Sequence, residues 1–465
     1  MVLCSLMLFV AMRAIAETTG RLWNNLVDRF SVPEEQWTTV DSMIYGMDSY
    51  FDYDEAWARE KRTRALREAF LHHYSSNLFY HRYCKDNDVQ PADIKTEEDL
   101  TSIPLVPDTF FKDYPEENPQ SVYEWLYRVS SVNIGDYDFT GSNMQDFLRW
   151  AENRLRGIVT HSSGTTGNFS IMFRDELTTR RLFYAFDRTL LFSIVHPDDD
   201  AQFVYPGPVK TYLTMGHWIS EGTRIFDKSQ RHFLTERELT MDIVRLMSGQ
   251  IQGFADKMKL KLLQRVMKKG QHKLIKLLQQ LNESGKQVII LTFPFQLYDL
   301  MEIMRQEDVS LSLGDQNSIV ITGGGWKIHQ NKKVSPQTFA GMIEETLGIP
   351  PEHYKDIYGM SEMNALGMDC EGRYKHLHPW LYPMVLDEDN QPMGYGEEGR
   401  FAFLDPVSNS YPGFIITGDR VRLYERCPAC GRPGVVMDSD ISRMAGAEAK
   451  GCGNLMRDLI AEELR

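Results

Sequence analysis

The chain has 465 residues, more than one compact core usually holds, so we expect two or more domains or subdomains. Hydrophobic residues make up 42% and charged residues 25% of it, as in soluble globular proteins. The formal net charge of −14 argues against a nucleic-acid binder, which needs a basic face, so we expect no nucleic-acid partner.

Residues 1–16 contain the apolar run VLCSLMLFVAM and the small-residue stretch AIA. A secretory signal begins with a basic region, and none precedes this run. The run is also shorter than the roughly 20 residues of a membrane span. We therefore expect a disordered or overextended start, with a cleaved signal peptide as the alternative. We expect a cytoplasmic protein without a transmembrane segment.

Residues 17–150 are rich in aromatic and charged side chains and predict a helical N-terminal part. Leu66, Phe70, Tyr74 and Phe79 recur at roughly helical spacing. The stretch SIPLVPDTFFKDYP contains three prolines and predicts a loop that leads into a short helix.

Residues 151–382 predict an α/β core that binds a nucleotide and a substrate. GIVTHSSGTTGNFSIMF is typical of a strand, a glycine loop and a second strand. Short apolar runs at 201–208, 286–295 and 318–327 alternate with helical patterns, which favours a mixed α/β architecture. Residues 383–440 predict an antiparallel hairpin in a small β subdomain, and 441–465 a short C-terminal segment.

The segment 256–281 predicts an amphipathic helix with eight Lys or Arg residues beside its apolar stripe. The stripe consists of Leu263, Val266, Met267, Leu274, Leu277, Leu278 and Leu281. A surface helix with one buried and one solvated face explains this pattern. The alternative is a docking face for an acidic partner or an anionic lipid surface.

The glycine loop is a candidate phosphate cradle, because backbone N–H groups converge there and hydroxyl groups add donors. It lacks the lysine of a Walker loop, so a flexible turn is an equally good interpretation of the loop by itself. Its residues are Ser162, Ser163, Gly164, Thr165, Thr166 and Gly167.

Four features further along the chain fit a nucleotide site. Gly323, Gly324 and Gly325 end a predicted strand, where ligands of α/β sheets bind. Glu362, four residues after Tyr358, could hold Mg²⁺ beside a triphosphate. Asp419 could accept hydrogen bonds from ribose hydroxyl groups. Arg443 could face a phosphate.

The motifs SSGTTG, YGMSE and TGD, in this order and at these separations, resemble the adenylate-forming superfamily over residues 100–465. The resemblance implies an adenylate-forming enzyme fold, with a large α/β N-terminal domain and a truncated C-terminal segment. It also implies an enzyme that joins a carboxylate to AMP from ATP with Mg²⁺. The nucleotide contacts would include Tyr358, Gly359, Met360 and Ser361.

A narrower set of motifs resembles the acyl-protein synthetase (LuxE-type) family, which is related to phenylacetate–CoA ligases. The motifs are IPLVPDTFFK, GGGWK, HLHPW, EEGRFAFLD, YPGFIITGD and GAEAKGCG. The resemblance implies that a fatty acid is activated as acyl-AMP, moved to a cysteine of the enzyme and passed to a partner such as a reductase or carrier. The cysteine in the matching place is Cys452.

The end of the sequence fits this narrower interpretation. Only 46 residues follow Asp419, fewer than a separate C-terminal domain needs. Lys327 and Lys450 are the candidates for the catalytic lysine that such a domain usually carries. Glycines flank Cys452, and Lys450 would favour its thiolate, the nucleophilic form. A buried structural cysteine is the alternative.

A second cysteine group predicts a structural zinc site. Cys427 and Cys430 have the CxxC spacing of half a site. The other half would be Cys370 with either His376 or His378, a pattern that resembles phenylacetate–CoA-ligase-like proteins. The sequence does not separate the two histidines, and it leaves open a redox CxxC pair or unused thiols.

Three functions are consistent with these patterns. The first is ATP-dependent activation of a carboxylic acid, with transfer to Cys452 and then to a partner protein. The second is an acyl-CoA, aryl-CoA or amide ligase with a soluble acceptor. The third is a non-catalytic nucleotide-binding scaffold. The expected acid pocket is apolar and formed by Phe293, Phe295, Met360, Met363 and Leu366.

Overall fold

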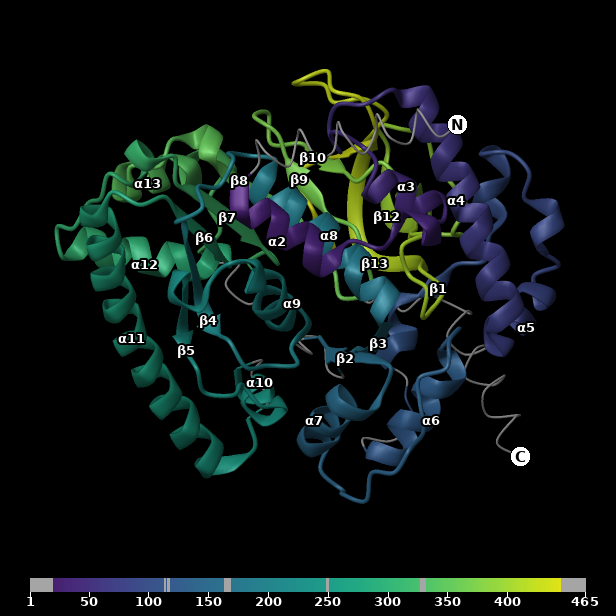
Figure 1. Ribbon diagram of the computed structural model, residues 1–465, viewed down its shortest axis with the longest axis horizontal. Coiled ribbons are helices and arrows are strands. Elements are labelled where there is room, and N and C mark those ends of the chain that lie inside the picture. Colours follow the sequence, from purple (N-terminus) through teal and green to yellow (C-terminus); the bar gives the residue numbers. More distant parts are fainter. Residues whose placement is uncertain are drawn as a thin grey trace.

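The computed structural model describes residues 20–112, 114, 118–162, 169–247, 251–326 and 332–444. The predicted start at 1–16 and most of the C-terminal segment at 441–465 lie outside these ranges. Figure 1 shows one large sheet with helices on both faces of its parallel half.

The parallel half of the sheet holds five neighbouring strands in the order β8-β7-β6-β4-β5. Their bounds are β4 (Gln202–Pro208), β5 (Arg231–Thr235), β6 (Val288–Thr292), β7 (Ile319–Gly323) and β8 (Tyr354–Tyr358). The central strands read VIILT and IVITG and are fully buried. Such continuous apolar runs are expected where helices cover both faces of a parallel sheet.

Helices on the two faces of this half form separate apolar clusters with the strands. One face carries α2 (Gly20–Phe30), α8 (Glu176–Phe192) and α9 (Thr214–Gly222). The other carries α11 (Gly253–Ser284), α12 (Pro294–Gln306) and α13 (Pro336–Leu347). The prediction of an α/β architecture is confirmed.

The antiparallel half continues from β8 in the order β9-β10-β14-β13-β12-β11. The bounds are β9 (Gly367–Asp369), β10 (Lys375–Leu377), β11 (Tyr382–Leu386), β12 (Glu398–Leu404), β13 (Phe414–Tyr424) and β14 (Val436–Met437). β1 (Val106–Pro107) and β15 (Ser442–Arg443) also pair with β13. The predicted hairpin after residue 383 is β11 and β12, and it is joined to the main sheet through the long strand β13.

The N-terminal part is helical, as the aromatic spacing predicts. Its helices are α3 (Thr39–Ile44), α4 (Glu55–Ser76), α5 (Leu78–Asp86), α6 (Pro119–Val129) and α7 (Met144–Arg154). Asp54, Asn77, Asn118 and Asn143 cap four of them by accepting hydrogen bonds from backbone N–H groups. α10 (Met241–Met247) lies further along the chain. The 3₁₀ helices are η1 (Glu34–Gln36), η2 (Pro91–Asp93), η3 (Glu98–Ser102), η4 (Asp108–Lys112), η5 (Thr223–Ile225), η6 (Lys228–Gln230), η7 (Leu313–Gln316) and η9 (Pro351–His353).

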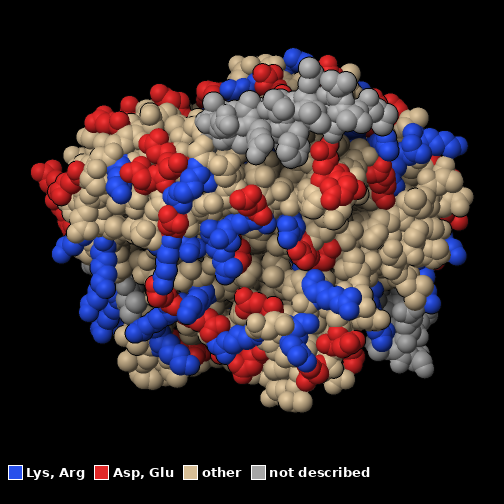
Figure 2. Space-filling model, in the orientation of Figure 1, with Lys and Arg blue, Asp and Glu red and all other residues tan. Residues whose placement is uncertain are grey.

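The helix predicted at 256–281 is α11, which ends before Gly285 in a left-handed conformation. On one face of this helix Leu274, Leu278 and Leu281 are buried, whereas Phe254 and Met258 near its start are exposed. Lys and Arg side chains gather at the lower left of Figure 2, where this helix lies in Figure 1. Docking of an acidic partner or a lipid surface on this face stays a prediction.

Within the described ranges, no helix combines the length and apolar character that crossing a membrane would need.

Candidate functional site

A cavity of about 830 Å³ opens at the carboxyl ends of the parallel strands. Ligands of open α/β sheets bind at this edge, because the loops after successive strands meet there. The lining includes Gly324 and Gly325 after β7 and the segment 358–362 after β8. The structure thus brings together two of the predicted nucleotide motifs, which lie more than 30 residues apart in sequence.

A hydrogen-bonded group of three side chains forms one wall of the cavity. The Tyr358 hydroxyl donates to Asp419 Oδ2 at 2.7 Å, and Arg443 Nε lies 3.2 Å from Asp419 Oδ1. Burial raises the pKa of the Asp419 carboxyl, and Arg443 and the Tyr358 hydroxyl oppose that shift. All three residues line the cavity. The TGD motif, the YGMSE motif and Arg443 therefore belong to one site.

Glu362 lies in the loop after β8 and is only 4% exposed, although it lines the cavity. Burial raises its pKa, Asp108 raises it further, and Ser170 and Lys112 oppose the rise. Asp108 is itself buried and lies 3.6 Å from Arg443 Nη1. Mg²⁺ prefers oxygen ligands, so the carboxylate oxygens of Glu362 and Asp108 could bind this ion.

Asp108 and Lys112 belong to η4, and the sequence analysis assigned neither of them to the site. The stretch SIPLVPDTFFKDYP was expected to form a loop that leads into a short helix, and η4 confirms the short helix. The signal that could have found them is the motif IPLVPDTFFK, in which the charged residues Asp108 and Lys112 lie four positions apart. The pairing of β1 with β13 brings this segment to Asp419.

The glycines after β7 have the conformations that glycine allows most readily. Gly324 and Gly325 have φ angles of 75° and 65°, and a Cβ at Gly325 would point into open space. A Cβ at Gly323 would lie 2.6 Å from Ile357 on the neighbouring strand. The backbone here can therefore approach a ligand closely. Lys327, which follows, lies outside the described residues.

The predicted strand, glycine loop and strand are confirmed by β2 (Gly157–His161) and β3 (Ile171–Asp175), which pair antiparallel. The Ser162 amide donates to the Ser170 carbonyl, and the Ser170 amide donates to Ser162 Oγ, both at 2.9 Å. These bonds close the base of the loop, and both serines line the cavity. Ser163, Gly164, Thr165, Thr166 and Gly167 lie outside the described residues.

Arg174 of β3 connects this hairpin to the loop after β8. Its Nε donates to Asn364 Oδ1 at 2.8 Å, and its Nη2 donates to the Ser361 carbonyl. The buried guanidinium also lies over the rings of Trp218 and Tyr411. These contacts hold the β2–β3 hairpin beside the loop that carries Glu362. A loop that binds the phosphates of a nucleotide would need to lie there.

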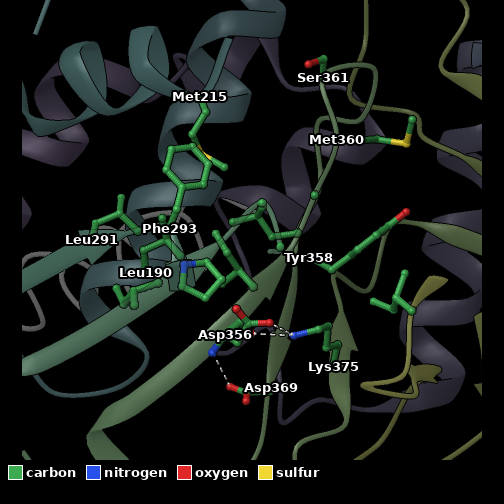
Figure 3. A pocket seen from close by; sticks show the side chains of 18 of the residues that line it. Leu190, Met215, Leu291, Phe293, Asp356, Tyr358, Met360, Ser361, Asp369 and Lys375 are labelled. Atoms are coloured by element: carbon green, nitrogen blue, oxygen red, sulfur yellow. Dashed lines mark hydrogen bonds and ion pairs between the residues drawn. The ribbon is translucent and has the colours of Figure 1, made fainter. Parts of the chain in front are cut away.

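The opposite end of the cavity is apolar and is called here the acyl chamber. Figure 3 shows Leu190, Met215, Leu291 and Phe293 on one side, away from Tyr358, Met360 and Ser361. The chamber is lined by Phe183, Phe186, Leu190 and Leu191 of α8, Met215, Trp218 and Ile219 of α9, and Phe203, Leu291, Phe293, Ile321 and Ile357. It is large and apolar enough for an alkyl chain.

The expected apolar pocket is correct in part. Phe293, Met360 and Leu366 line the cavity, whereas Phe295 packs in the cluster beneath α11–α13 and Met363 is fully buried elsewhere. The sequence analysis missed the contribution of α8. Its signal is the segment LFYAFDRTLLF, in which apolar residues occur on most sides of the helix except at Asp187, Arg188 and Thr189, as expected of a buried helix.

A set of paired charges supports the strand ends below the cavity (Figure 3). Lys375 Nζ lies 2.6 Å from Asp356 Oδ2, and the Asp356 amide donates to Asp369 Oδ1 at 2.8 Å. Arg373 Nη1 lies 3.0 Å from Asp369 Oδ2. Since each of these groups has a partner, we assign them a structural role in fixing β8.

One polar group in the acyl chamber has no such pairing. Asp187 of α8 is 7% exposed, and its Oδ2 has no hydrogen-bond partner among the described residues. Burial alone raises the pKa of its carboxyl to about 8. A neutral carboxyl group in an apolar wall is a candidate for ligand recognition.

Four side chains on the far side of the antiparallel half could hold a metal ion. The ligand atoms of Cys370, His376, Cys427 and Cys430 all lie within 4.8 Å of one another. Cys370 Sγ and Cys427 Sγ are 3.7 Å apart, and Cys430 Sγ is 3.3 Å from His376 Nε2. Zinc–sulfur bonds of about 2.3 Å in a tetrahedron give sulfur separations of about 3.8 Å, so the donor set fits zinc.

The structure decides between the two histidines, and His378 is not among the candidate ligands. Its Nε2 lies 2.8 Å from Thr189 Oγ1, and its Nδ1 accepts a hydrogen bond from the Leu366 amide at 3.2 Å. Burial lowers its pKa to about 3, so the ring is neutral at physiological pH. On strand β10, residues 376 and 378 are separated by Leu377, but the strand ends there, so only His376 faces the cysteines.

The candidate acyl acceptor Cys452 and the second candidate lysine, Lys450, lie outside the described residues. Together with Lys327 and residues 163–167 of the glycine loop, they are the candidates that the structure does not place.

The chain is similar in sequence to a known protein family and to two ligases. Residues 265–461 match the sequence model of the acyl-protein synthetase family LuxE. A long-chain-fatty-acid–luciferin-component ligase of Aliivibrio fischeri is 25% identical over 428 residues, which are 92% of this chain and 95% of that protein. The corresponding ligase of Vibrio harveyi is 22% identical over 418 residues, with 89% and 92% covered.

Among solved structures, an open conformation of 2-hydroxyisobutyryl-CoA ligase, in complex with 2-HIB-AMP and CoA, matches with a TM-score of 0.56. The identity is 15%, and the match covers 90% of this chain and 83% of that chain. The same ligase in its postadenylation state gives a TM-score of 0.56, 16% identity and coverages of 89% and 73%. The predicted adenylate-forming enzyme fold is thus confirmed.

The buried Asp187 makes stability depend on pH. The unfolded chain releases this proton near pH 4, whereas the folded protein holds it to about pH 8, so folding takes up a proton between these values. Stability of the unmodified protein therefore falls as pH rises through this window. We expect Asp187→Asn to gain stability progressively from pH 5 to pH 8, reaching about 1–3 kcal/mol.

Urea unfolding at each pH measures this difference. Leu190→Ala is the control, because it opens the same wall without removing a titrating group and should keep the pH dependence of the unmodified protein. A gain for Asp187→Asn that is constant across the range would contradict the assignment of a proton to buried Asp187.

Proposed function

We propose that this chain, a ligase of the LuxE-type acyl-protein synthetase family, uses ATP to activate a long-chain fatty acid and then transfers the acyl group to its own Cys452. The observation that carries the proposal is the single cavity with a polar wall at one end and the acyl chamber at the other. An acid in the chamber can extend its carboxylate to a nucleotide held at the polar wall.

In the first step, a carboxylate oxygen of the acid attacks the α-phosphorus of ATP. The new bond gives the acyl-adenylate, and the bond to pyrophosphate breaks. The residues that would hold Mg²⁺ are Glu362 and Asp108, and the ion would neutralise the charge of the triphosphate and the leaving pyrophosphate. Lys112 and Arg443 add positive charge to the same wall.

Asp419 has the geometry of a ribose acceptor. Tyr358 and Arg443 fix the orientation of its carboxylate and favour the ionised form. Lone pairs on its two oxygens can accept hydrogen bonds from two vicinal hydroxyl groups. We assign Gly324, Gly325 and residues 359–361 to the close backbone contacts with the nucleotide, and Ser162 to Gly167 to the phosphates.

In the second step, the Cys452 thiolate attacks the acyl carbon, a thioester forms and AMP leaves. The thioester retains much of the activation, so a partner with its own thiol can receive the acyl group. We propose an acyl-accepting protein as that partner. We place the reaction in the cytoplasm, where cysteine thiols remain reduced.

The four residues Cys370, His376, Cys427 and Cys430 are proposed to bind a structural zinc ion. The site would connect strands β9 and β10 to the turn at 427–430, and no step of the reaction passes through it.

Replacement of Cys452 by Ser tests the two-step reaction. Protein incubated with Mg-ATP and radiolabelled fatty acid should carry a thioester, which hydroxylamine releases, and Cys452→Ser should lose this label. The variant should retain ATP–pyrophosphate exchange, because exchange reports only the first step. Cys84→Ser, at a buried cysteine of α5, is the matched control and should retain both signals.

Other outcomes identify the alternatives. A label that persists in Cys452→Ser contradicts the acceptor role. Undiminished acyl-CoA formation by the variant with free CoA would favour a ligase with a soluble acceptor. Binding of ATP without exchange for any acid would favour a nucleotide-binding scaffold.

Replacement of Asp419 by Ala tests the ribose contact. We expect KM for ATP in the exchange reaction to rise about 10- to 100-fold, because two hydrogen bonds to a charged group are lost. Asp389→Ala, in the exposed turn between β11 and β12, should behave as the unmodified protein. An unchanged KM for ATP would remove Asp419 from the nucleotide site.

Metal analysis tests the zinc proposal. The purified chain should contain on the order of one zinc ion. His376→Ala and Cys427→Ser should lose it, and His378→Gln should retain it, since the Nδ1 and Nε2 atoms of His378 bond elsewhere. Retention of zinc by His376→Ala with loss by His378→Gln would overturn the assignment of ligands.

A further inference from the structure

We propose that the first turns of α11, residues 253–265, dock on an anionic membrane surface. This segment is called the basic ridge. The sequence left such a surface open as an alternative for the amphipathic segment 256–281. The proposal goes beyond the chemistry of the cavity, because no described residue of α11 lines it.

The buried side chains of α11 belong to its later turns. Leu274, Leu278 and Leu281 are buried, and a Cβ added at Gly270 would lie 2.5 Å from the side chain of Leu234 on β5. Among the described side chains of the helix, none before Leu274 is buried. In Figure 1, α11 runs along the left edge of the molecule, and its start lies at the bottom beside α10. The basic ridge therefore stands at an edge of the fold.

Large apolar side chains are exposed along one line of the basic ridge. Phe254, Met258 and Leu262 are 79%, 53% and 63% exposed. Their spacing of four residues places them on one face of the helix. Phe254 and Leu262 are the two most exposed large apolar side chains in the described part of the chain. A group of exposed apolar side chains marks a site of interaction with a protein or a membrane.

Basic side chains flank this apolar line on both sides. At 3.6 residues per turn, Lys257 and Lys261 lie on one flank and Lys259 on the other, and Arg265 continues the line itself. All four side chains are exposed. None of them forms an ion pair in the part of the chain that the structure describes. Their charges are therefore available to an external partner.

The charge of this helix is opposite to that of the whole chain. The chain has a formal net charge of −14, whereas α11 contains eight Lys or Arg and only two acidic residues, Asp256 and Glu283. Asp256 accepts a hydrogen bond from the Gln252 amide at 2.9 Å and so serves the start of the helix. Lys and Arg side chains gather where α11 lies (Figure 2). An anionic surface repels the chain as a whole and attracts this helix.

The arrangement favours a lipid surface over an acidic protein. An apolar line between basic flanks is typical of an interfacial helix, whose apolar side chains enter the membrane while its lysines extend to the headgroups. Fluid headgroups can meet the charges on both flanks at once. An acidic protein would need an apolar groove with an acidic rim on each side to do the same. The cytoplasmic leaflet of a membrane carries the anionic lipids that this surface requires.

Docking would bring the enzyme to the place where its substrate collects. Long-chain fatty acids partition into membranes, because water disfavours their apolar chains. An enzyme held at the surface meets a higher concentration of the acid than one in solution. This consequence, unlike the docking itself, rests on the proposed function.

Flotation of the full chain with lipid vesicles tests the docking. We expect binding to vesicles of equal parts phosphatidylglycerol and phosphatidylcholine, much weaker binding to pure phosphatidylcholine, and weakening by about 0.5 M NaCl. Phe254→Gln with Leu262→Gln should lower the affinity on the order of 10- to 100-fold, because two inserting side chains are lost. Lys257→Gln with Lys261→Gln and Arg265→Gln should lower it by a similar factor.

Matched controls lie elsewhere on the surface. Leu71→Gln with Leu78→Gln replaces two exposed apolar side chains of α4 and α5, which are 54% and 58% exposed. Arg67→Gln with Lys85→Gln and Lys95→Gln removes three exposed charges. Both controls should bind as the unmodified protein does, and thermal unfolding of every variant reports folding independently of lipid.

Four outcomes would overturn the docking. They are no binding to either vesicle, equal binding to both, binding that survives both sets of ridge substitutions, and equal loss of binding in the controls. Binding of polyglutamate in place of phosphatidylglycerol vesicles would identify a face for an acidic protein. A dimer in solution that the ridge substitutions dissociate would assign the face to a second copy of this chain.

ATP–pyrophosphate exchange separates the docking from the proposed function. The ridge variants should retain exchange with the acid supplied in solution and lose it on the order of 10-fold with the acid embedded in phosphatidylglycerol vesicles. Equal exchange on the embedded acid would overturn the delivery of substrate by docking. Exchange with no acid at all contradicts the proposed function, and flotation still decides the docking.

Discussion

The hydrogen bond between Tyr358 and Asp419 brings together two strands that are not neighbours in the sheet. β8 ends at Tyr358, and three strands separate it from β13, which carries Asp419. In a flat sheet, four strand spacings would place these strands about 19 Å apart. The 2.7 Å contact therefore requires the sheet to coil strongly between its parallel and antiparallel halves. The polar end of the cavity exists because of this coiling.

The other end of the cavity depends on the attachment of α8. Arg181 donates to Asp41 of α3 through Nε at 2.8 Å and Nη2 at 2.6 Å, and this ion pair is almost completely buried. Arg188 donates to the Asp48 carbonyl at 2.8 Å and lies over the ring of Tyr50. Loss of one partner of a buried pair leaves an uncompensated charge, at a cost of about 3–5 kcal/mol. The N-terminal helices therefore determine where the wall of the acyl chamber lies.

The cluster of Cys370, His376, Cys427 and Cys430 supports the same region from the opposite side. Strands β9 and β10 pair with each other, and β9 pairs with β8 directly before the segment that ends in Glu362. The turn at 427–430 follows β13, the strand that carries Asp419. A metal ion held there would connect β9 and β10, of which β9 pairs with β8, to the turn that follows β13. Separate parts of the chain thus position one site through strand pairing and side-chain bonds.

The sequence by itself determined the strand, glycine loop and strand, the buried strands that end in glycine, and the order of YGMSE and TGD. These are local patterns, because hydrophobic periodicity and backbone requirements act over a few residues. It also supplied the CxxC pair and Cys370 as candidate metal ligands. It did not supply the choice of His376, since His376 and His378 differ only in which partners surround them. The tertiary structure was needed to place Asp108, Asp187 and the wall formed by α8 and α9 in one cavity. Contacts between residues far apart in sequence determine where these side chains lie. Burial, which makes Asp187 an unpaired polar group instead of a surface charge, exists only after the chain has packed.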